Sequence, residues 1–322
     1  MHVLITGGAG FIGSNFVRLF VNGSFPSISR ISILDKLTYA GTLDNLPLSI
    51  SRSQNFTQGD ICDSILIGSL LTEVDAVINF AAETHVDRSI LGATDFVQTN
   101  ILGVHVLLDE IKSSGRDIRF IQVSTDEVYG SINEGTWTEE WPLQPNSPYS
   151  ASKASGELLA RSYYRTHGLD VVITRCSNNY GTHHFPEKLI PLFITNLIEG
   201  KKVPLYGTGE NVRDWLHVDD HCRGIYSVLI KGRSGEVYNI GGGRELTNNE
   251  ITSLILESMC ADEKSIEYVE DRKGHDFRYS VDWSKINREL GYEPQIKFED
   301  GLKETIQWYR ENEAWWKPLK NR

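Results

Sequence analysis

The chain has 322 residues, 40% of them hydrophobic and 23% charged, a composition that suits a globular protein with a large core. Its formal net charge of −11, without any block rich in Lys or Arg, argues against nucleic acid as a partner. The four cysteines are scattered, no basic leader precedes the first strand, and no apolar run is long enough for a membrane span. We therefore expect a reduced, cytoplasmic protein without a metal site or membrane segment, built as one large domain with a smaller appended part.

The N-terminal segment has the pattern of a strand, a glycine loop and a helix. The apolar run within Met1–Thr6 is typical of a buried parallel strand. Glycines follow at every third position, as Gly7, Gly10 and Gly13. Such glycines let the backbone approach a pyrophosphate, and the N-terminus of the next helix offers free N–H groups. Asp35 ends the next predicted strand, at the spacing of a carboxylate that binds the adenine ribose, although it could instead cap a loop. An acid there repels a 2′-phosphate, so the segment favours NAD over NADP.

Strands and helices alternate through the first half of the chain. We expect strands at 31–34, 55–58, 75–80, 119–124 and 171–174, and helices at 63–72, 94–113 and 149–167. This alternation predicts an α/β fold, a doubly wound parallel (Rossmann) sheet, over residues 1–176. Residues 177–322 should mainly form a smaller C-terminal substrate-binding α/β part, with some segments returning to the sheet. There we expect a turn-rich loop at 178–181, strands at 203–206 and 237–240, and helices at 188–199, 219–230, 248–258 and 299–312.

Two polar clusters are candidates for catalysis, one on the predicted helix at 149–167 and one directly after the predicted strand at 119–124. Tyr149 and Lys153 lie one helical turn apart and therefore on the same helical face. A neighbouring ammonium and an oxidised nicotinamide both favour the phenolate, so this tyrosine could remove a hydroxyl proton. Asp126 and Glu127 are adjacent carboxyls, whose repulsion pushes two pKa values apart and suits an acid beside a base. The alternatives are an ordinary surface Tyr and Lys and a solvated acidic turn.

Seven stretches of sequence carry a family resemblance. They are Asp35–Gly41, Ala81–Ser89, Ser124–Gly130, Ser177–Gly181, His184–Pro191, Arg213–Asp220 and Asp271–Asp276. With the glycine loop and Tyr-x-x-x-Lys, they resemble the extended short-chain dehydrogenase/reductase superfamily, and within it the nucleoside-diphosphate-glucose 4,6-dehydratases. The resemblance covers essentially the whole chain. Thr182 and Lys273 depart from it, because each stands where Pro is usual.

The resemblance implies a reaction on a nucleotide-linked glucose, with dTDP-glucose favoured and the nucleobase left open. Tyr149 would take the proton of the sugar 4-hydroxyl while NAD+ takes the C4 hydride. Glu127 would be the base at C5, Asp126 the acid on the leaving 6-hydroxyl, and Thr125 a hydrogen-bond partner of the sugar oxygen. The hydride would then return to C6, so that NAD is the retained cofactor.

The resemblance also implies two sets of binding residues. The cofactor would contact Gly7, Gly10, Phe11, Ile12, Gly13, Asp35, Lys36, Thr38, Asp60, Ile61, Ala81, Ala82, Thr99, Tyr149, Lys153 and Asn179. The substrate would contact Thr84, His85, Thr125, Asn178, Lys188, Leu189, Pro204, Tyr206, Arg213, Asn248, Asp271, Arg272 and His275. For each Arg among these, the alternative is a surface ion pair.

Other functions remain as alternatives. A sugar-nucleotide 4-epimerase needs no acid/base pair for loss of water, and a UDP-glucuronate decarboxylase resembles this pattern without the Asp that precedes the Glu. Asp126 therefore favours dehydration. A non-catalytic NAD-binding regulatory protein would not need the Tyr, Lys and carboxyl groups together.

His217-x-x-x-His221 could suggest a metal, but we interpret it as part of the family motif. The resemblance further implies a homodimer, packed through the helices at 94–113 and 149–167.

Overall fold

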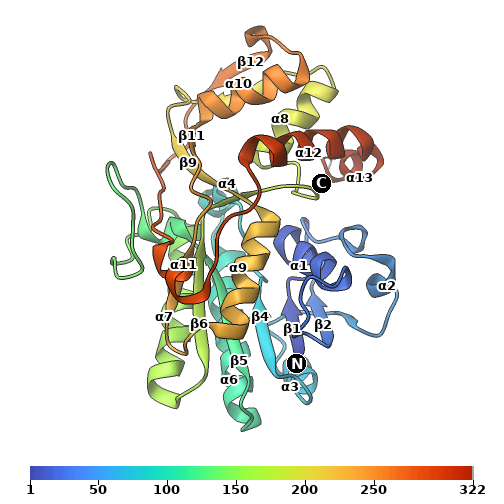
Figure 1. Ribbon diagram of the computed structural model, residues 1–322, viewed down its shortest axis with the longest axis vertical. Helices are drawn as coiled ribbons and strands as arrows, with labels where there is room; N and C mark the ends of the chain where they lie inside the picture. Colours follow the sequence, from blue (N-terminus) through green and yellow to red (C-terminus); the bar gives the residue numbers. More distant parts are fainter. Residues whose placement is uncertain (321–322) are drawn as a thin grey trace.

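The structure is a computed structural model that describes residues 1–320. Within this range the centre is a parallel sheet of seven strands, in the order β10-β6-β5-β4-β1-β2-β3 (Figure 1). The strands are β1 (His2–Thr6), β2 (Arg30–Asp35), β3 (Phe56–Gln58), β4 (Ala76–Asn79), β5 (Arg119–Thr125), β6 (Val171–Cys176) and β10 (Val237–Ile240). The chain order reverses beside β1, and a sheet of this kind binds ligands outside the carboxyl ends of the strands at that point.

Side chains leave the strands alternately toward two apolar cores. Val3 and Ile5 belong to one core and Leu4, which lies between them, belongs to the other. The first core is closed by α1 (Phe11–Val21), α9 (Val218–Lys231) and α11 (Ser284–Leu290), the second by α3 (Ser64–Leu70), α6 (Val104–Ser114) and α7 (Pro148–His167). Helices on both faces confirm the predicted doubly wound α/β fold. Over residues 1–320, no helix combines the length and apolar character needed to cross a membrane.

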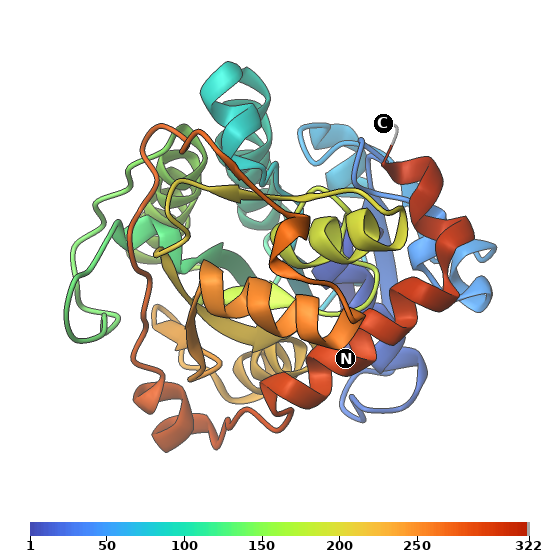
Figure 2. The same cartoon turned by 90° about the horizontal axis from the view of Figure 1, so that it is seen from above.

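A smaller part lies beyond the carboxyl ends of the central strands (Figures 1 and 2). It contains the sheet β11-β9-β7 and the pair β12-β8. Its elements are β7 (Asn178–Tyr180), α8 (Leu189–Ile198), β8 (Val203–Tyr206), β9 (Val212–His217), β11 (Glu245–Thr247), α10 (Asn248–Met259), β12 (Ile266–Val269), α12 (Phe298–Glu311) and α13 (Glu313–Leu319). Tyr180, Phe193, Ile251 and Trp316 belong to its own apolar core. The later elements β10, α9 and α11 return to the main sheet, while the domain boundary after residue 176 stays a prediction.

The predicted loop at 178–181 is wrong, because its first three residues form β7. This strand runs parallel to β9, with Asn178 opposite Trp215 and Tyr180 opposite His217. Two consecutive Asn residues disfavour a strand by local preference, but pairing with β9 outweighs that preference. The strand matters for the site, because it carries Asn178 and Asn179 beyond the end of β6.

The predicted helix at 94–113 is interrupted. It consists of α5 (Thr94–Val97), the π-helical turn η2 (Gln98–Gly103) and α6. Within η2, the Asn100 amide exchanges hydrogen bonds of 3.0 Å with the backbone of Glu83 and donates to Ser152 Oγ at 2.8 Å. A Cβ on Gly156 would lie 2.6 Å from the Asn100 carbonyl oxygen, so α7 packs closely here. The wide turn therefore ties α7 to the segment after β4, as π-helical turns near functional sites often do.

The aromatic C-terminal segment packs on its own chain. The side chain of Trp316 is completely buried, and Trp308 lies 4.2 Å from the His183 ring. The Trp315 Nε1–H donates to Asn45 Oδ1 at 3.0 Å, and Asn45 Nδ2 donates to the Ala9 carbonyl at 2.8 Å. The segment thus reaches the glycine loop through one intermediate side chain.

The remaining short elements are η1 (Leu43–Asn45), α2 (Leu48–Ser51), α4 (Val86–Leu91), η3 (Asp126–Tyr129) and η4 (Glu263–Ser265).

Candidate active site

The glycine loop between β1 and α1 forms a cradle with no room for side chains. A Cβ on Gly13 would lie 2.3 Å from the Gly7 carbonyl oxygen. Gly7 has a φ of +66°, and a Cβ there would lie 2.5 Å from the Ala81 nitrogen. The loop leads directly into α1, whose first N–H groups have no helical partner. Such a cradle suits the diphosphate of a dinucleotide.

Replacing Gly13 by Ala should therefore damage this cradle, because backbone atoms would have to move. We expect the unfolding free energy to fall by about 1–3 kcal/mol and the bound NAD per subunit to decrease. Gly92→Ala is the matched control, because a Cβ there meets no atom within 4 Å. Denaturant unfolding and the NAD content of the purified protein measure both effects. Equal results for the two variants would contradict the close-approach argument.

Asp35 lines the end of the site beside the glycine loop. Its Oδ2 accepts a hydrogen bond from the Ala9 N–H and its Oδ1 accepts from the Leu37 N–H, both at 2.8 Å. Burial raises the pKa of Asp35, and these N–H groups oppose the rise. The bonds orient the carboxylate and leave further lone pairs for ribose hydroxyls. Lys36, which pairs with Asp60 at 2.7 Å, lies beside it.

Two cavities join into one groove from Asp35 to Tyr149. They share Gly7, Gly10, Ala40, Phe80 and Ala82. The first contains the predicted residues Asp35, Lys36, Thr38, Asp60, Ile61, Ala81 and Thr99, and the second Phe11, Ile12, Gly13, Tyr149, Lys153 and Asn179. The structure thus places every predicted cofactor residue on this groove. Its shape, its glycine cradle and its ribose-side carboxylate fit a dinucleotide.

Tyr149 and Lys153 project from the start of α7. Ser147 and Ser150 form a capping box that fixes this start, with Pro148 as the first helical residue. Lys153 Nζ donates to the Val123 carbonyl at 2.7 Å, and burial lowers the pKa of Lys153 to about 8. The ammonium is therefore held by β5 on the side of the groove where Tyr149 lies.

In the protein alone the pKa of Tyr149 lies above its ordinary value, so the lowering expected from Lys153 together with an oxidised nicotinamide stays a prediction. Burial raises this pKa well above its ordinary value, and the charge of Glu127 raises it further, against an opposing effect of Thr125. A lowered pKa thus requires an additional positive charge, of the kind that an oxidised nicotinamide carries.

Asp126 and Glu127 occupy the short turn η3 directly after β5. The Thr125 hydroxyl accepts from the Glu127 N–H at 3.3 Å and donates to Asp126 Oδ1 at 3.2 Å. Asp126 Oδ2 is buried without a hydrogen-bond partner. Burial and the charges of Glu127 and Asp214 raise the pKa of Asp126 well above its usual range.

Glu127 has a different environment. Burial raises its pKa too, but Arg272, Lys188 and Arg213 oppose the rise. The two neighbours are therefore unequal: Asp126 is suited to hold a proton, whereas Glu127 is close to cations that favour its ionised form.

Because the pKa of Asp126 is raised, we expect the difference in stability between Asp126→Asn and the unmodified protein to depend on pH. Because Asp126 binds a proton more readily in the folded protein, its contribution to the unfolding free energy falls as pH rises from its unfolded pKa toward the raised value. The loss is about 1.4 kcal/mol per pH unit above about pH 4. Asn has no proton to lose, so the stability of Asp126→Asn relative to the unmodified protein should increase with pH. Denaturant unfolding at several pH values measures this, and a constant difference would contradict the raised pKa.

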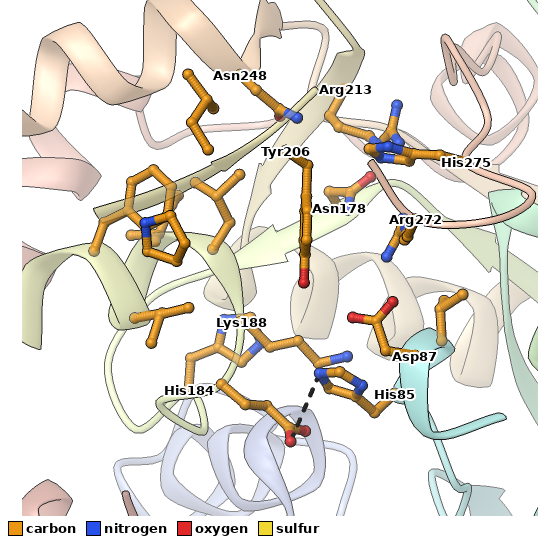
Figure 3. Close-up of a pocket in the computed structure, with 18 of the residues that line it drawn as sticks. His85, Asp87, Asn178, His184, Lys188, Tyr206, Arg213, Asn248, Arg272 and His275 are labelled. Carbon is orange, nitrogen blue, oxygen red and sulfur yellow. Dashed lines mark ion pairs between the residues drawn. The ribbon is translucent and has the colours of Figure 1, made fainter. Parts of the chain in front are cut away.

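A third cavity shares Glu127, Asn178 and Lys188, among others, with the groove. Figure 3 shows residues that line it. This cavity contains the predicted substrate residues His85, Asn178, Lys188, Leu189, Pro204, Tyr206, Arg213, Asn248, Arg272 and His275. Thr84 and Thr125 line the cofactor groove instead. Asp271 lines neither the third cavity nor the adjoining part of the groove. Its Oδ1 lies 2.6 Å from His275 Nδ1. Asp271 thus supports His275, which lines the cavity, and its own contact with substrate stays a prediction.

Sequence reasoning missed other lining residues. These include Val86, Asp87, His184, Glu187, Trp215 and Tyr279. Glu187 accepts from the Tyr39 hydroxyl at 3.0 Å and lies 3.3 Å from Arg88 Nη2, so it joins the loop after β2 to α4. All but Tyr279 lie within the quoted family stretches, so the signal was present, but the sequence does not indicate which members face the cavity.

Three cations converge on this cavity. Lys188 Nζ donates to the Thr84 carbonyl at 3.1 Å, and Arg213 lies 4.3 Å above the Tyr279 ring. Arg272 Nε is buried without a partner. Among residues 1–320, none of the three takes part in an ion pair. Arg213 donates to the Val212 and Asp276 carbonyls at 2.7 and 2.9 Å, and all three side chains line the cavity. The surface ion pair alternative does not apply, and the arrangement suits a diphosphate.

The His-x-x-x-His pair has separate local roles. His217 Nδ1 accepts from the Asp219 N–H at the start of α9, and His221 Nδ1 lies 2.9 Å from Asn179 Oδ1. Within the described chain, no group of three or more His, Cys, Asp or Glu side chains is arranged to hold a metal ion.

A dinucleotide groove, a Tyr-x-x-x-Lys pair at its end and an adjoining polar cavity define the extended short-chain dehydrogenase/reductase class of protein. The family model described as GDP-mannose 4,6 dehydratase matches residues 4–305. The chain belongs to this family, and its similarity to dTDP-glucose 4,6-dehydratases confirms the resemblance inferred from the sequence.

Individual relatives are similar over their whole length. A dTDP-glucose 4,6-dehydratase of Streptomyces niveus is 57% identical, with 100% of this chain and 96% of the relative aligned. The crystal structure of DesIV, a dTDP-glucose 4,6-dehydratase from Streptomyces venezuelae with NAD bound, gives a TM-score of 0.97 at 57% identity, covering 99% and 100% of the two chains. A UDP-glucose 4-epimerase from Thermotoga maritima gives a TM-score of 0.88 at 32% identity, covering 97% and 99%.

Proposed function

We propose that this protein is an NAD-dependent hydro-lyase that converts dTDP-glucose to its 4-keto-6-deoxy derivative. The observation that carries the proposal is the pair Asp126–Glu127, placed at the same groove as Tyr149 and Lys153. Full-length relatives with this activity in their names support it. The residue roles below rest on position and chemistry.

The chain's own groups carry the proton transfers. When bound, NAD+ supplies oxidation at C4 and later reduction at C6, and is regenerated in each cycle. The Tyr149 oxygen takes the proton of the C4 hydroxyl, and Lys153 stabilises the phenolate side of that exchange. The resulting ketone acidifies the C5 proton, which Glu127 removes. Asp126, whose pKa is raised by burial, gives a proton to the departing 6-hydroxyl, and Thr125 orients both the carboxyl and the sugar oxygen.

The cavity beyond Glu127 holds the nucleotide half of the substrate. Lys188, Arg213 and Arg272 neutralise the diphosphate, and Asn178 and Asn248 offer polar contacts. Leu189, Pro204 and Tyr206 provide an apolar and aromatic wall against which a nucleobase can pack. Figure 3 shows Tyr206 in this wall.

The main alternative is sugar-nucleotide 4-epimerisation, since an epimerase has the same fold. An epimerase needs oxidation and reduction at C4 but no acid for a leaving hydroxyl. The buried, proton-holding Asp126 has no task in that reaction. A decarboxylase would likewise need no acid at C6, and a regulatory NAD-binding protein would need neither Tyr149 nor the carboxyl pair.

The test is incubation with dTDP-glucose without added NAD. We expect a product lighter by one water, with the alkaline ultraviolet absorbance of a 4-keto-6-deoxy sugar nucleotide. A new product of unchanged mass would indicate epimerisation instead. In a separate incubation with UDP-glucuronate, a product that has lost carbon dioxide would indicate decarboxylation.

A homodimer through α5–α6 and α7 is also proposed. Most apolar residues of the helix at 94–113, among them Phe96, Leu107 and Ile111, are buried within the chain, but Val97, Leu102 and Leu158 are 51%, 46% and 55% exposed. These exposed side chains support a contact with a second copy. Light scattering should give a dimer, and Leu102→Glu with Leu158→Glu should give a monomer; a monomer before substitution would overturn the proposal.

A cytoplasmic location is proposed as well. The four cysteines Cys62, Cys176, Cys222 and Cys260 are all free thiols, as expected in a reducing compartment. Fractionation of the producing cells tests it.

A further inference from the structure

The turn that presents Asp126 and Glu127 is too short to hold itself in place. It is a four-residue 3₁₀ turn, Asp126–Tyr129, and such turns have weak hydrogen bonds of their own. Thr125 fixes its start. Its end packs closely against the backbone of Gln144 at Gly130, which has a φ of +87°. A Cβ at this position would lie 2.4 Å from the Gln144 carbonyl oxygen. The last residue of the turn, Tyr129, provides the deepest anchor.

The Tyr129 hydroxyl is the centre of a buried network. It accepts a hydrogen bond from Arg175 Nη1 at 2.7 Å and donates to Asn239 Oδ1 at 2.9 Å. The Arg175 guanidinium lies 4.7 Å from the centre of the Tyr129 ring, and Trp137 stacks on that ring at 5.1 Å. Asn239 in turn donates to the Trp137 carbonyl at 2.9 Å. Tyr129, Arg175 and Asn239 come from η3, β6 and β10, so the turn is fastened to two strands of the main sheet.

The same arginine also holds the helix that carries Tyr149 and Lys153. Arg175 Nη2 and Nε donate to Glu157 Oε2 at 2.7 and 3.0 Å. Glu157 lies on α7, one turn beyond Lys153, and both members of this ion pair are almost completely buried. One guanidinium therefore contacts the turn that carries the carboxyl pair and the helix that carries the tyrosine–lysine pair.

Desolvation of a buried ion pair largely offsets its attraction, so stability alone gives little reason to keep one. Its geometric effect is larger, because a planar guanidinium with two partners fixes distance and angle together. None of the network side chains lines the cofactor groove or the adjoining cavity.

We propose that Tyr129, Arg175 and Glu157 are positioning residues that set the placement of Asp126–Glu127 relative to Tyr149–Lys153. This inference rests on the proposed function, since it concerns the coupling of C4 oxidation to the loss of water at C5–C6. The network acts on the second step. Loss of the Tyr129 hydroxyl frees the carboxyl turn while α7 keeps its ion pair with Arg175.

Tyr129→Phe tests the proposal, with Tyr238→Phe as the matched control. Tyr238 is also completely buried, and its hydroxyl contacts Glu289 Oε2 at 3.1 Å. In Tyr129→Phe we expect C5 proton exchange and product formation to fall by about tenfold to hundredfold, the effect of a displacement of roughly 1 Å. Oxidation at C4, read from the near-ultraviolet absorbance of reduced nicotinamide on the enzyme, should persist, so reduced cofactor accumulates. Tyr238→Phe should change neither step.

A second variant tests the proposal in case Tyr129→Phe does not fold. Glu157→Leu combined with Arg175→Met removes the network without leaving a buried charge, and such replacements usually keep the fold. Because this variant also releases α7, oxidation at C4 should fall too, and elimination should fall further than oxidation. If the two steps fall together, in proportion to the folded fraction measured by circular dichroism, the network is structural only and the proposal is overturned. Absence of product from the unmodified enzyme would instead refute the proposed function itself.

Discussion

Asp126→Asn should stop loss of water while leaving removal of the C5 proton largely intact. Asn has the shape of Asp but no proton to give to the 6-hydroxyl, and a positioned acid contributes about 10²- to 10⁴-fold to a rate. We therefore expect product formation to fall by that factor. Exchange of the C5 hydrogen with deuterated water, followed by nuclear magnetic resonance of recovered dTDP-glucose, should continue because Glu127 is unchanged.

Glu127→Gln is the matched comparison. It removes the base near Lys188, Arg213 and Arg272, so both C5 exchange and product formation should be lost. The two variants differ only in which neighbouring carboxyl has become an amide. Equal loss of exchange in both would mean that the acid and base assignments are wrong.

Tyr149→Phe should block the reaction one step earlier. Without the phenolic oxygen no group is placed to take the C4 hydroxyl proton, and the rate should fall by about 10²- to 10⁴-fold. Reduced nicotinamide should not appear on the enzyme when substrate is added, in contrast to Asp126→Asn, where oxidation at C4 still occurs. Single-turnover absorbance measurements separate these cases.

Tyr163→Phe is the control for this substitution. Tyr163 lies on the same helix, and its hydroxyl is 3.0 Å from His105 Nδ1, away from the groove. It should keep both oxidation and product formation. Formation of reduced cofactor by Tyr149→Phe at the unmodified rate would show that another group removes the proton.

The sequence was sufficient for the parts of the site that depend on local pattern. The glycine spacing, Asp35 at the end of β2 and the Tyr149–Lys153 pair follow from regular strand and helix periods. The structure brings them together because parallel strands share one carboxyl edge. Asp126 and Glu127 were located the same way, directly after β5.

Features that depend on tertiary contacts could not be predicted locally. The strand β7 forms because β9 pairs with it. The π-helical turn forms where the side-chain amide of Asn100 makes hydrogen bonds with Glu83 and Ser152. The raised pKa of Tyr149 depends on burial and on Glu127, which only the folded arrangement reveals. Likewise, Asp271 matched a family stretch, yet its side chain supports His275 instead of lining the cavity.

The most direct test of the account is the fate of the C4 hydrogen. The enzyme should be incubated with dTDP-glucose carrying deuterium at C4, in ordinary water and without added NAD, and the product analysed by mass spectrometry and nuclear magnetic resonance. We expect a product lighter by one water, with the deuterium now at C6 and a solvent hydrogen at C5. Deuterium retained at C4, or lost to solvent, would contradict this expectation.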